Sequence, residues 1–123
     1  MKVNASLFGL DFFFFYARGL VILANAGAIR VPRPLFDGKF HQQVYLVMEY
    51  LEKGNPAPNF WQNFGESIAE LHKHTQENFG LPFQNYIGRL HQPNNAHAKW
   101  CDFYKEERLI FLLEKARNRK LLS

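Results

Sequence analysis

The chain has 123 residues, of which 47% are hydrophobic, 16% aromatic and 21% charged, and this composition is typical of a single globular domain. Its formal charge of +4 suits an anionic ligand, but no basic stripe along a helix and no glycine–aromatic signature indicates nucleic-acid binding. Cys101 is the only cysteine, so an intrachain disulfide is excluded and the cytoplasm is the expected compartment.

The N-terminal segment predicts one buried helix. Residues 1–4 are too short for a secure strand assignment. Asp11 can cap a helix over Phe12–Ala26, and Gly27 is well placed to end it in the left-handed conformation. Polar and charged residues interrupt the apolar run over residues 7–29, which favours a helix covered by protein on several sides over a membrane anchor.

The next segments predict a hairpin and a linker. Leu35–Phe40 predicts a short strand, in which Asp37-Gly38 is a strong turn signal. Val44–Leu51 is a nearly continuous apolar run that predicts a second, central strand. Residues 52–59 are rich in glycine and proline, so they predict a linker or domain hinge.

The C-terminal half predicts two helices joined by a loop. Asn59 can cap a helix that begins at Phe60 and ends before Asn78, with an apolar face at helical spacing. The segment from Asn78 to about His97 predicts a long loop, and Ala98–Lys120 predicts a final helix. Together these elements indicate an α+β chain with its strands in the first half.

Generic catalytic and metal-binding motifs are missing from the sequence. It has no Gly-x-Gly-x-x-Gly or Walker loop, no Gly-x-Ser-x-Gly elbow and no Cys-x-x-Cys pair. His72 and His74 stand two residues apart, whereas two helical residues that share a metal ion need a spacing of three or four. The histidine pattern therefore predicts no metal site.

Several spaced segments carry a family resemblance. They are Lys2-Val3-Asn4, Arg18-Gly19-Leu20, Gly27-Ala28-Ile29-Arg30, Leu46-Val47-Met48-Glu49-Tyr50-Leu51, Phe79-Gly80-Leu81, Asn85-Tyr86-Ile87-Gly88, Gln92-Pro93-Asn94 and Glu106-Glu107-Arg108-Leu109. In this order and at this spacing they resemble the fructosamine and ketosamine kinase family, and the resemblance extends over nearly the whole chain.

The resemblance implies a partial protein-kinase-like fold. Residues 1–51 would form an incomplete N-terminal lobe of antiparallel strands and one helix. Residues 52–59 would form the hinge or linker, and residues 60–123 the beginning of the C-terminal lobe, with two helices and a long loop. The family uses ATP and Mg²⁺ to phosphorylate the sugar of glycated amines, so a nucleotide and a ketosamine are the implied ligands.

The resemblance also assigns a phosphate-binding lysine and an altered partner for it. Lys2 matches the strand lysine that holds the ATP phosphates in kinases. In the family a helix glutamate pairs with this lysine, and the corresponding position here is Tyr16, directly after the four phenylalanines at residues 12–15. Because a tyrosine is uncharged at neutral pH, the resemblance implies a weakened ion-pair site.

Two further ligand-facing segments follow from the resemblance. Glu49, Tyr50 and Leu51 match the hinge whose main-chain groups bond the adenine edge, and they can be the end of a core strand at the same time. Asn85 and Tyr86 lie in the loop expected near the acceptor, where their side chains could hydrogen-bond sugar hydroxyls. The alternative for these two residues is that they only order a long loop.

The segments that perform the chemistry in the family are not found in this sequence. The glycine-rich loop would precede Lys2, and the His-Gly-Asp segment and the metal-binding aspartate would follow Ser123. We therefore expect no Mg²⁺ ligands and no phosphoryl transfer by this chain alone, so its status as an enzyme stays open. Two alternatives stay open: a non-catalytic nucleotide-binding or interaction module, and a membrane-associated protein. If the chain is a fragment of a kinase, the apolar surface that the fragment leaves exposed would favour self-association.

Overall fold

The computed structural model describes residues 2–4, 10–41, 43–88 and 90–121, and the side chains of residues 2–4, 10 and 11 lie outside that description. The chain forms two compact units, Met1–Thr75 and Gln76–Ser123. The domain boundary expected at residues 52–59 stays a prediction.

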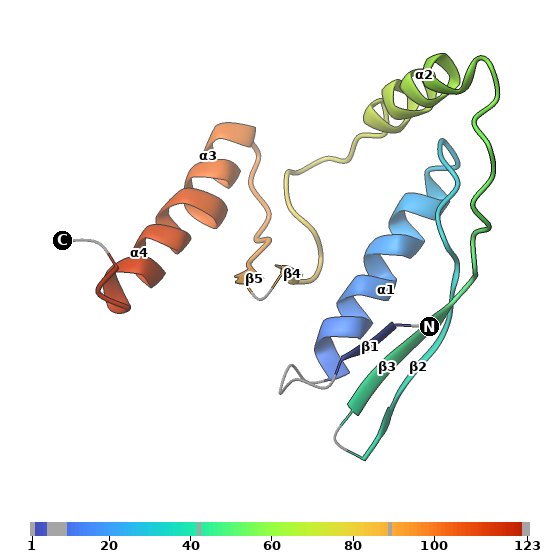
Figure 1. Cartoon of the computed structure of the whole chain (residues 1–123). Coiled ribbons are helices and arrows are strands. Elements are labelled where there is room, and N and C mark those ends of the chain that lie inside the picture. Colours follow the sequence, from blue (N-terminus) through green and yellow to red (C-terminus); the bar gives the residue numbers. More distant parts are fainter. Residues whose placement is uncertain (1, 5–9, 42, 89, 122–123) are drawn as a thin grey trace. The chain divides into compact units, whose positions relative to one another are not determined.

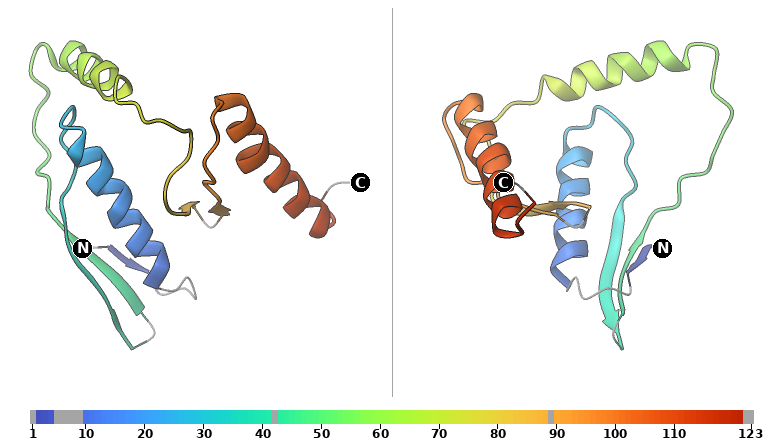
Figure 2. Two further views of the ribbon diagram at one scale, coloured as in Figure 1. Left: turned by 180° about the vertical axis from the view of Figure 1, so that it is seen from behind. Right: turned by 60° about the vertical axis from the view of Figure 1, so that its left-hand side comes forward.

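The first unit contains a three-stranded antiparallel sheet with one helix on it. The strands are β1 (Lys2–Asn4), β2 (Pro34–Phe40) and β3 (Gln43–Met48) in the spatial order β1-β3-β2. Helix α1 (Leu10–Asn25) lies along one face of this sheet in all views (Figures 1 and 2). The predicted hairpin and its central second strand are therefore confirmed.

The core of the first unit lies between α1 and β3. Phe13, Val44 and Leu46 are its buried residues, and Leu46 is fully buried. Gly27 follows the helix with φ of 66°, which confirms the predicted left-handed exit. The outward face of α1 remains exposed, with Phe14 at 47%, so the expectation of cover on several sides is not met within this unit.

The turn expected at Asp37-Gly38 is wrong. Both residues lie inside β2, and Gly38 pairs with Tyr45 across the hairpin. A Cβ on Gly38 would lie 2.5 Å from the Tyr45 hydroxyl oxygen, so the glycine makes room for the tyrosine side chain rather than for a turn. The chain instead reverses beyond β2, where His41 has φ of 52°, and β3 ends at Met48, three residues earlier than expected.

Helix α2 (Phe60–His72) begins where the sequence predicts. Asn59 occupies the N-cap position, but its side chain makes no capping hydrogen bond, so the predicted capping interaction is wrong. The aromatic rings of Phe60 and Phe64 stack at 6.0 Å between centroids. These rings and Trp61 are exposed, and the helix has no buried residue.

The second unit replaces the predicted long loop with ordered β structure. Strands β4 (Asn85–Ile87) and β5 (Leu90–Gln92) form an antiparallel hairpin. An isolated antiparallel bridge joins Phe79 to His97 through N–H···O distances of 2.8 and 2.9 Å. Strands of three residues are too short to give a recognisable alternation of polar and apolar side chains, which is why the sequence pattern suggested a loop.

A single helical stretch ends the described chain, as the sequence predicts, but its middle is π-helical. It consists of α3 (Trp100–Tyr104), the π-helical segment η1 (Lys105–Ile110) and α4 (Phe111–Asn118). π-helical turns of this kind occur frequently at functional sites. No helix within the described ranges is both long and apolar enough to cross a membrane.

Candidate functional site

The predicted adenine hinge leaves the sheet directly after β3. The main-chain N–H of Glu49 donates to the carbonyl oxygen of Arg33 at 2.8 Å, which extends the β2–β3 pairing by one residue. Tyr50 is 81% and Leu51 36% exposed. No hydrogen bond is found to the main-chain groups of these two residues from any part of the chain that the structure describes.

The Glu49 carboxylate is bound by two donors from the segment that follows α1. Oε1 accepts a hydrogen bond from Arg30 Nη2 at 2.9 Å, and Oε2 accepts one from the main-chain N–H of Arg33 at 3.3 Å. The Arg30 hydrogen bond, and secondly that from Arg33, lower the pKa of Glu49 below its ordinary value. The carboxylate therefore stays ionised and attached to residues 30–33 at neutral pH.

The lysine site is only partly visible. Lys2 pairs with Leu46 in the β1–β3 ladder, but its side chain lies outside the described residues, so its assignment to phosphates stays a prediction. Tyr16 lies on α1 and is 38% exposed. A tyrosine offers no carboxylate, so the weakened ion-pair site that the resemblance implies stays a prediction.

Asn85 and Tyr86 both contact other parts of their own unit. Asn94 Nδ2 donates to Asn85 Oδ1 at 3.1 Å and to the carbonyl of Phe83 at 2.9 Å. The rings of Tyr86 and His91 meet edge to face across the hairpin, at 5.6 Å between centroids. These contacts give both residues a role in ordering the loop, and a role toward a sugar stays a prediction.

A buried polar network holds this loop to the final helix, and sequence reasoning did not find it. Glu107, which is 6% exposed, accepts hydrogen bonds from Asn95 Nδ2 at 3.1 Å and His97 Nε2 at 3.0 Å. Arg108 donates to the carbonyl of Pro93 and to Asn94 Oδ1, each at 2.6 Å. In the sequence the network is visible only as a Glu-Arg pair in the middle of the predicted helix. Nothing in that pair indicates which loop residues bind it.

The network accounts for the shifted pKa of Glu107, and two of its side chains come from the π-helical segment. Burial raises the pKa of Glu107, and the hydrogen bonds from His97 and Asn95 outweigh this effect, so its pKa lies below the ordinary value. Glu107 and Arg108 both lie in η1. A π-helical turn places one extra residue in the turn, and here two consecutive side chains bind the same loop.

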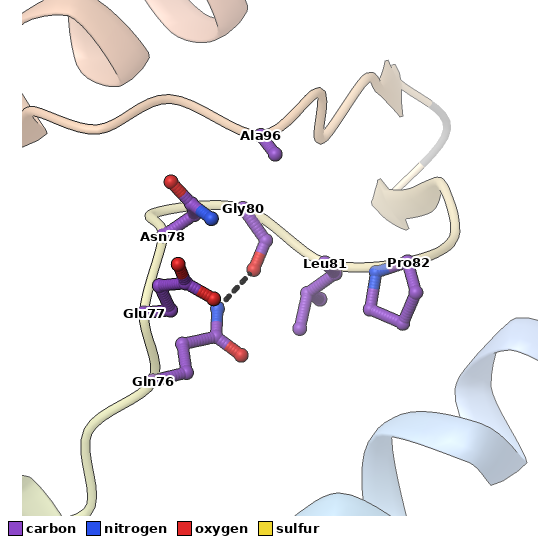
Figure 3. A pocket seen from close by; sticks show the side chains of 7 residues that line it. All are labelled: Gln76, Glu77, Asn78, Gly80, Leu81, Pro82 and Ala96. Atoms are coloured by element: carbon purple, nitrogen blue, oxygen red, sulfur yellow. Dashed lines mark hydrogen bonds between the residues drawn. The ribbon is translucent and has the colours of Figure 1, made fainter.

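A shallow pocket of about 280 Å³ lies beside this loop (Figure 3). The residues that line it are Gln76, Glu77, Asn78, Gly80, Leu81, Pro82 and Ala96. Gln76 Nε2 donates to the carbonyl of Gly80 at 2.5 Å (Figure 3). Gly80 has φ of 138°, and a Cβ there would lie 2.7 Å from the Asn94 carbonyl oxygen, so only glycine fits. None of the predicted site residues lines this pocket.

His91 connects the hairpin to α4. Its ring lies 5.9 Å from the Phe111 ring between centroids. Burial, and secondly the charge of Lys115, lower the pKa of His91. A histidine with a lowered folded-state pKa binds its proton less readily than the unfolded chain does, so stability is lost as the pH falls below about 6.5.

We therefore expect the chain to lose more stability between pH 8 and pH 5 than a His91→Gln variant does. Thermal unfolding at both pH values measures this difference. His74→Gln, which replaces an exposed histidine of the other unit, is the matched control and should behave like the unmodified chain. An identical pH dependence with and without His91 would show that its ring does not titrate on unfolding.

The structure also shows how the side chains that could bind a metal ion are placed. Among the described residues, no group of three or more His, Cys, Asp or Glu side chains is placed to hold an ion.

The first unit combines an antiparallel sheet, one covering helix and an extended segment that leaves the central strand. Two solved structures share this architecture. A Haemophilus somnus protein described as a fructosamine-3-kinase matches 98% of this chain and 41% of its own, with a TM-score of 0.85 and 28% identity. A Thermobifida fusca protein described in the same way matches with a TM-score of 0.74, at 30% identity, over 92% of this chain and 38% of its own.

The chain thus has part of a kinase-like fold. The fructosamine kinase family model matches residues 1–122, and the chain belongs to the fructosamine kinase family.

Named relatives agree with this assignment. A probable ketoamine kinase from Synechocystis is 39% identical over 104 residues, which cover 84% of this chain and 35% of that protein. The chloroplastic protein-ribulosamine 3-kinase of Arabidopsis thaliana is 34% identical over 121 residues, covering 96% of this chain and 36% of that protein. The chain spans a little over a third of the length of these relatives.

Proposed function

We propose that this chain supplies the adenine-recognition part of an ATP-dependent kinase that phosphorylates the sugar of ketosamines. The observation that carries the proposal is the main chain of Tyr50 and Leu51, which follows a strand end anchored at Glu49 and accepts or donates no hydrogen bond to the rest of the described residues. Family membership supplies the reaction class, a phosphoryl transfer. The nucleotide and the ketosamine are the ligands of this proposal, and the cytoplasm is its compartment.

The chemistry of adenine fits the hinge. Its edge offers the exocyclic amino group as a donor beside a ring nitrogen acceptor, so it needs a carbonyl and an N–H close together on the protein. Main-chain groups of Tyr50 and Leu51 and the carbonyl of Glu49 include both kinds. Because the Glu49 N–H is already bonded to Arg33, it is not available for this role.

A non-catalytic nucleotide-binding module is the second candidate. It is favoured by Tyr16, which stands at the position that the family resemblance assigns to the glutamate. Both candidates use the same hinge, and they differ only in whether phosphate is transferred.

We expect the chain to bind adenosine and to discriminate against inosine by about tenfold or more, because the 6-oxo base reverses the donor and the acceptor and leaves polar groups unpaired. Calorimetric titration with both nucleosides measures this ratio. The Leu51→Pro substitution removes the main-chain N–H of residue 51, and it should weaken adenosine binding by a similar factor. Lys53→Pro, two residues along the linker, is the matched control and should retain binding. Equal affinity for the two nucleosides would exclude edge recognition by the hinge.

A further inference from the structure

Three contacts join residue 49 to the segment between α1 and β2. The Glu49 N–H donates to the Arg33 carbonyl at 2.8 Å. The two carboxylate oxygens of Glu49 accept hydrogen bonds from different residues, Arg30 at 2.9 Å and the Arg33 main chain at 3.3 Å. Glu49 is therefore held through its main chain and its side chain at once.

This arrangement fixes the point at which the hinge leaves the sheet. The Arg33 contacts tie Glu49 to the beginning of β2, and Arg30 lies three residues after the left-handed exit of α1 at Gly27. Beyond Glu49, the described structure contains no hydrogen bond that holds the main chain of Tyr50 or Leu51. The direction of these two residues thus depends on how firmly Glu49 is oriented.

We propose that Glu49 and Arg30 are positioning residues of the nucleotide site, a role that rests on the proposed function. Their side chains orient the Tyr50 and Leu51 main chain toward the adenine edge and do not touch the base. Because small displacements of binding groups reduce recognition strongly, the loss of either charge weakens nucleotide binding.

An ordinary surface ion pair is the competing explanation. The Arg30 side chain is 75% exposed and that of Glu49 34%, and exposed pairs contribute little to folding stability. This exposure makes the two explanations separable. A positioning pair changes ligand affinity without changing the melting temperature, whereas a surface pair without a role changes neither.

The test uses ¹⁵N-labelled chain titrated with adenosine, which lacks phosphates and so reports the base site alone. Glu49→Gln removes the charge but keeps an oxygen for the Arg33 N–H, and Arg30→Gln removes the guanidinium. We expect each to raise the Kd for adenosine about three- to tenfold with an unchanged melting temperature. Glu52→Gln, an exposed carboxylate three residues along, is the matched control and should bind like the unmodified chain.

A second readout does not need the ligand. The amide hydrogen of Glu49 should exchange faster with solvent in both variants, because its hydrogen bond to the Arg33 carbonyl is less firmly held. The amide hydrogen of Leu46, which lies in the core, should exchange at an unchanged rate. The charge-exchanged double variant Arg30→Glu with Glu49→Arg should recover part of the adenosine affinity.

The outcomes are distinguishable. Unchanged affinity and unchanged Glu49 exchange in both single variants would overturn the positioning role. A fall in melting temperature with faster exchange at Leu46 as well would also overturn it, since the pair would then support the fold in general. If the unmodified chain fails to bind adenosine, the proposed function is rejected, and the Glu49 exchange rates alone decide whether the pair orients the hinge.

Discussion

Incubation of the purified 123-residue chain with MgATP and a fructosamine is expected to give no phosphorylated product above the uncatalysed background. Enzymatic phosphoryl transfer depends on positioning and on charge stabilisation by Mg²⁺, with little covalent chemistry by the protein. The family resemblance places the catalytic aspartate in a His-Gly-Asp segment, and the 123 residues contain no such segment. Without these groups, rate enhancements of many orders of magnitude are lost.

Phosphorus NMR of the reaction mixture measures this expectation directly. A full-length ketoamine kinase with demonstrated activity serves as the positive control under the same conditions. Product formation in proportion to the concentration of this chain would contradict the account, because the catalytic groups would then have to lie within these residues.

Disruption of the buried network on η1 is the second change with a large expected effect. Arg108→Met leaves the Pro93 carbonyl and the Asn94 amide oxygen without their 2.6 Å donor. Asn94 is only 6% exposed, so water replaces this donor poorly. We expect the second unit to lose about 3 kcal/mol of stability.

Hydrogen exchange in native conditions measures this loss at the bridge between Phe79 and His97, where both amides are hydrogen-bonded. Arg117→Met, an exposed arginine on α4, is the matched control and should change the stability by less than about 0.5 kcal/mol. Equal exchange rates in the two variants would mean that the Arg108 hydrogen bonds contribute no net stability.

Long elements could be predicted because each carries its own periodic signal. The amphipathic pattern of α2 and the mid-chain hairpin needed only local sequence, and Gly27 marked the end of α1 by its conformational freedom. The family resemblance supplied the kinase-like fold, which the structural comparisons support. Local signals were therefore sufficient for most of the elements.

The errors have physical reasons as well. The Asp37-Gly38 pair is typical of a turn, but the role of Gly38 depends on the side chain of Tyr45 across the hairpin. The apolar run to Leu51 suggested a longer β3, yet the strand ends at Met48. For Gly38 a contact across the hairpin decided the outcome, and a single sequence does not reveal such contacts.

The candidate site also combines residues that the sequence indicates with partners that only the fold reveals. The family resemblance assigns a hinge to residues 49–51, which stays a prediction, whereas the two arginine donors to Glu49 come from 16 and 19 residues away. Likewise, the partners of Glu107 lie in a loop 10 and 12 residues before it. Motifs identify candidate residues, whereas the groups that orient them become visible only in the fold.

Under the proposed function, this chain recognises the adenine base through the main-chain groups of residues 49–51. Parallel titrations with adenosine and with MgATP test it most directly. We expect both to bind at the hinge with affinities within about threefold of each other, since the sequence contains no glycine-rich or Walker loop to bind the phosphates. Binding of MgATP that is stronger than that of adenosine by about a hundredfold or more, or no binding of either ligand, would contradict it.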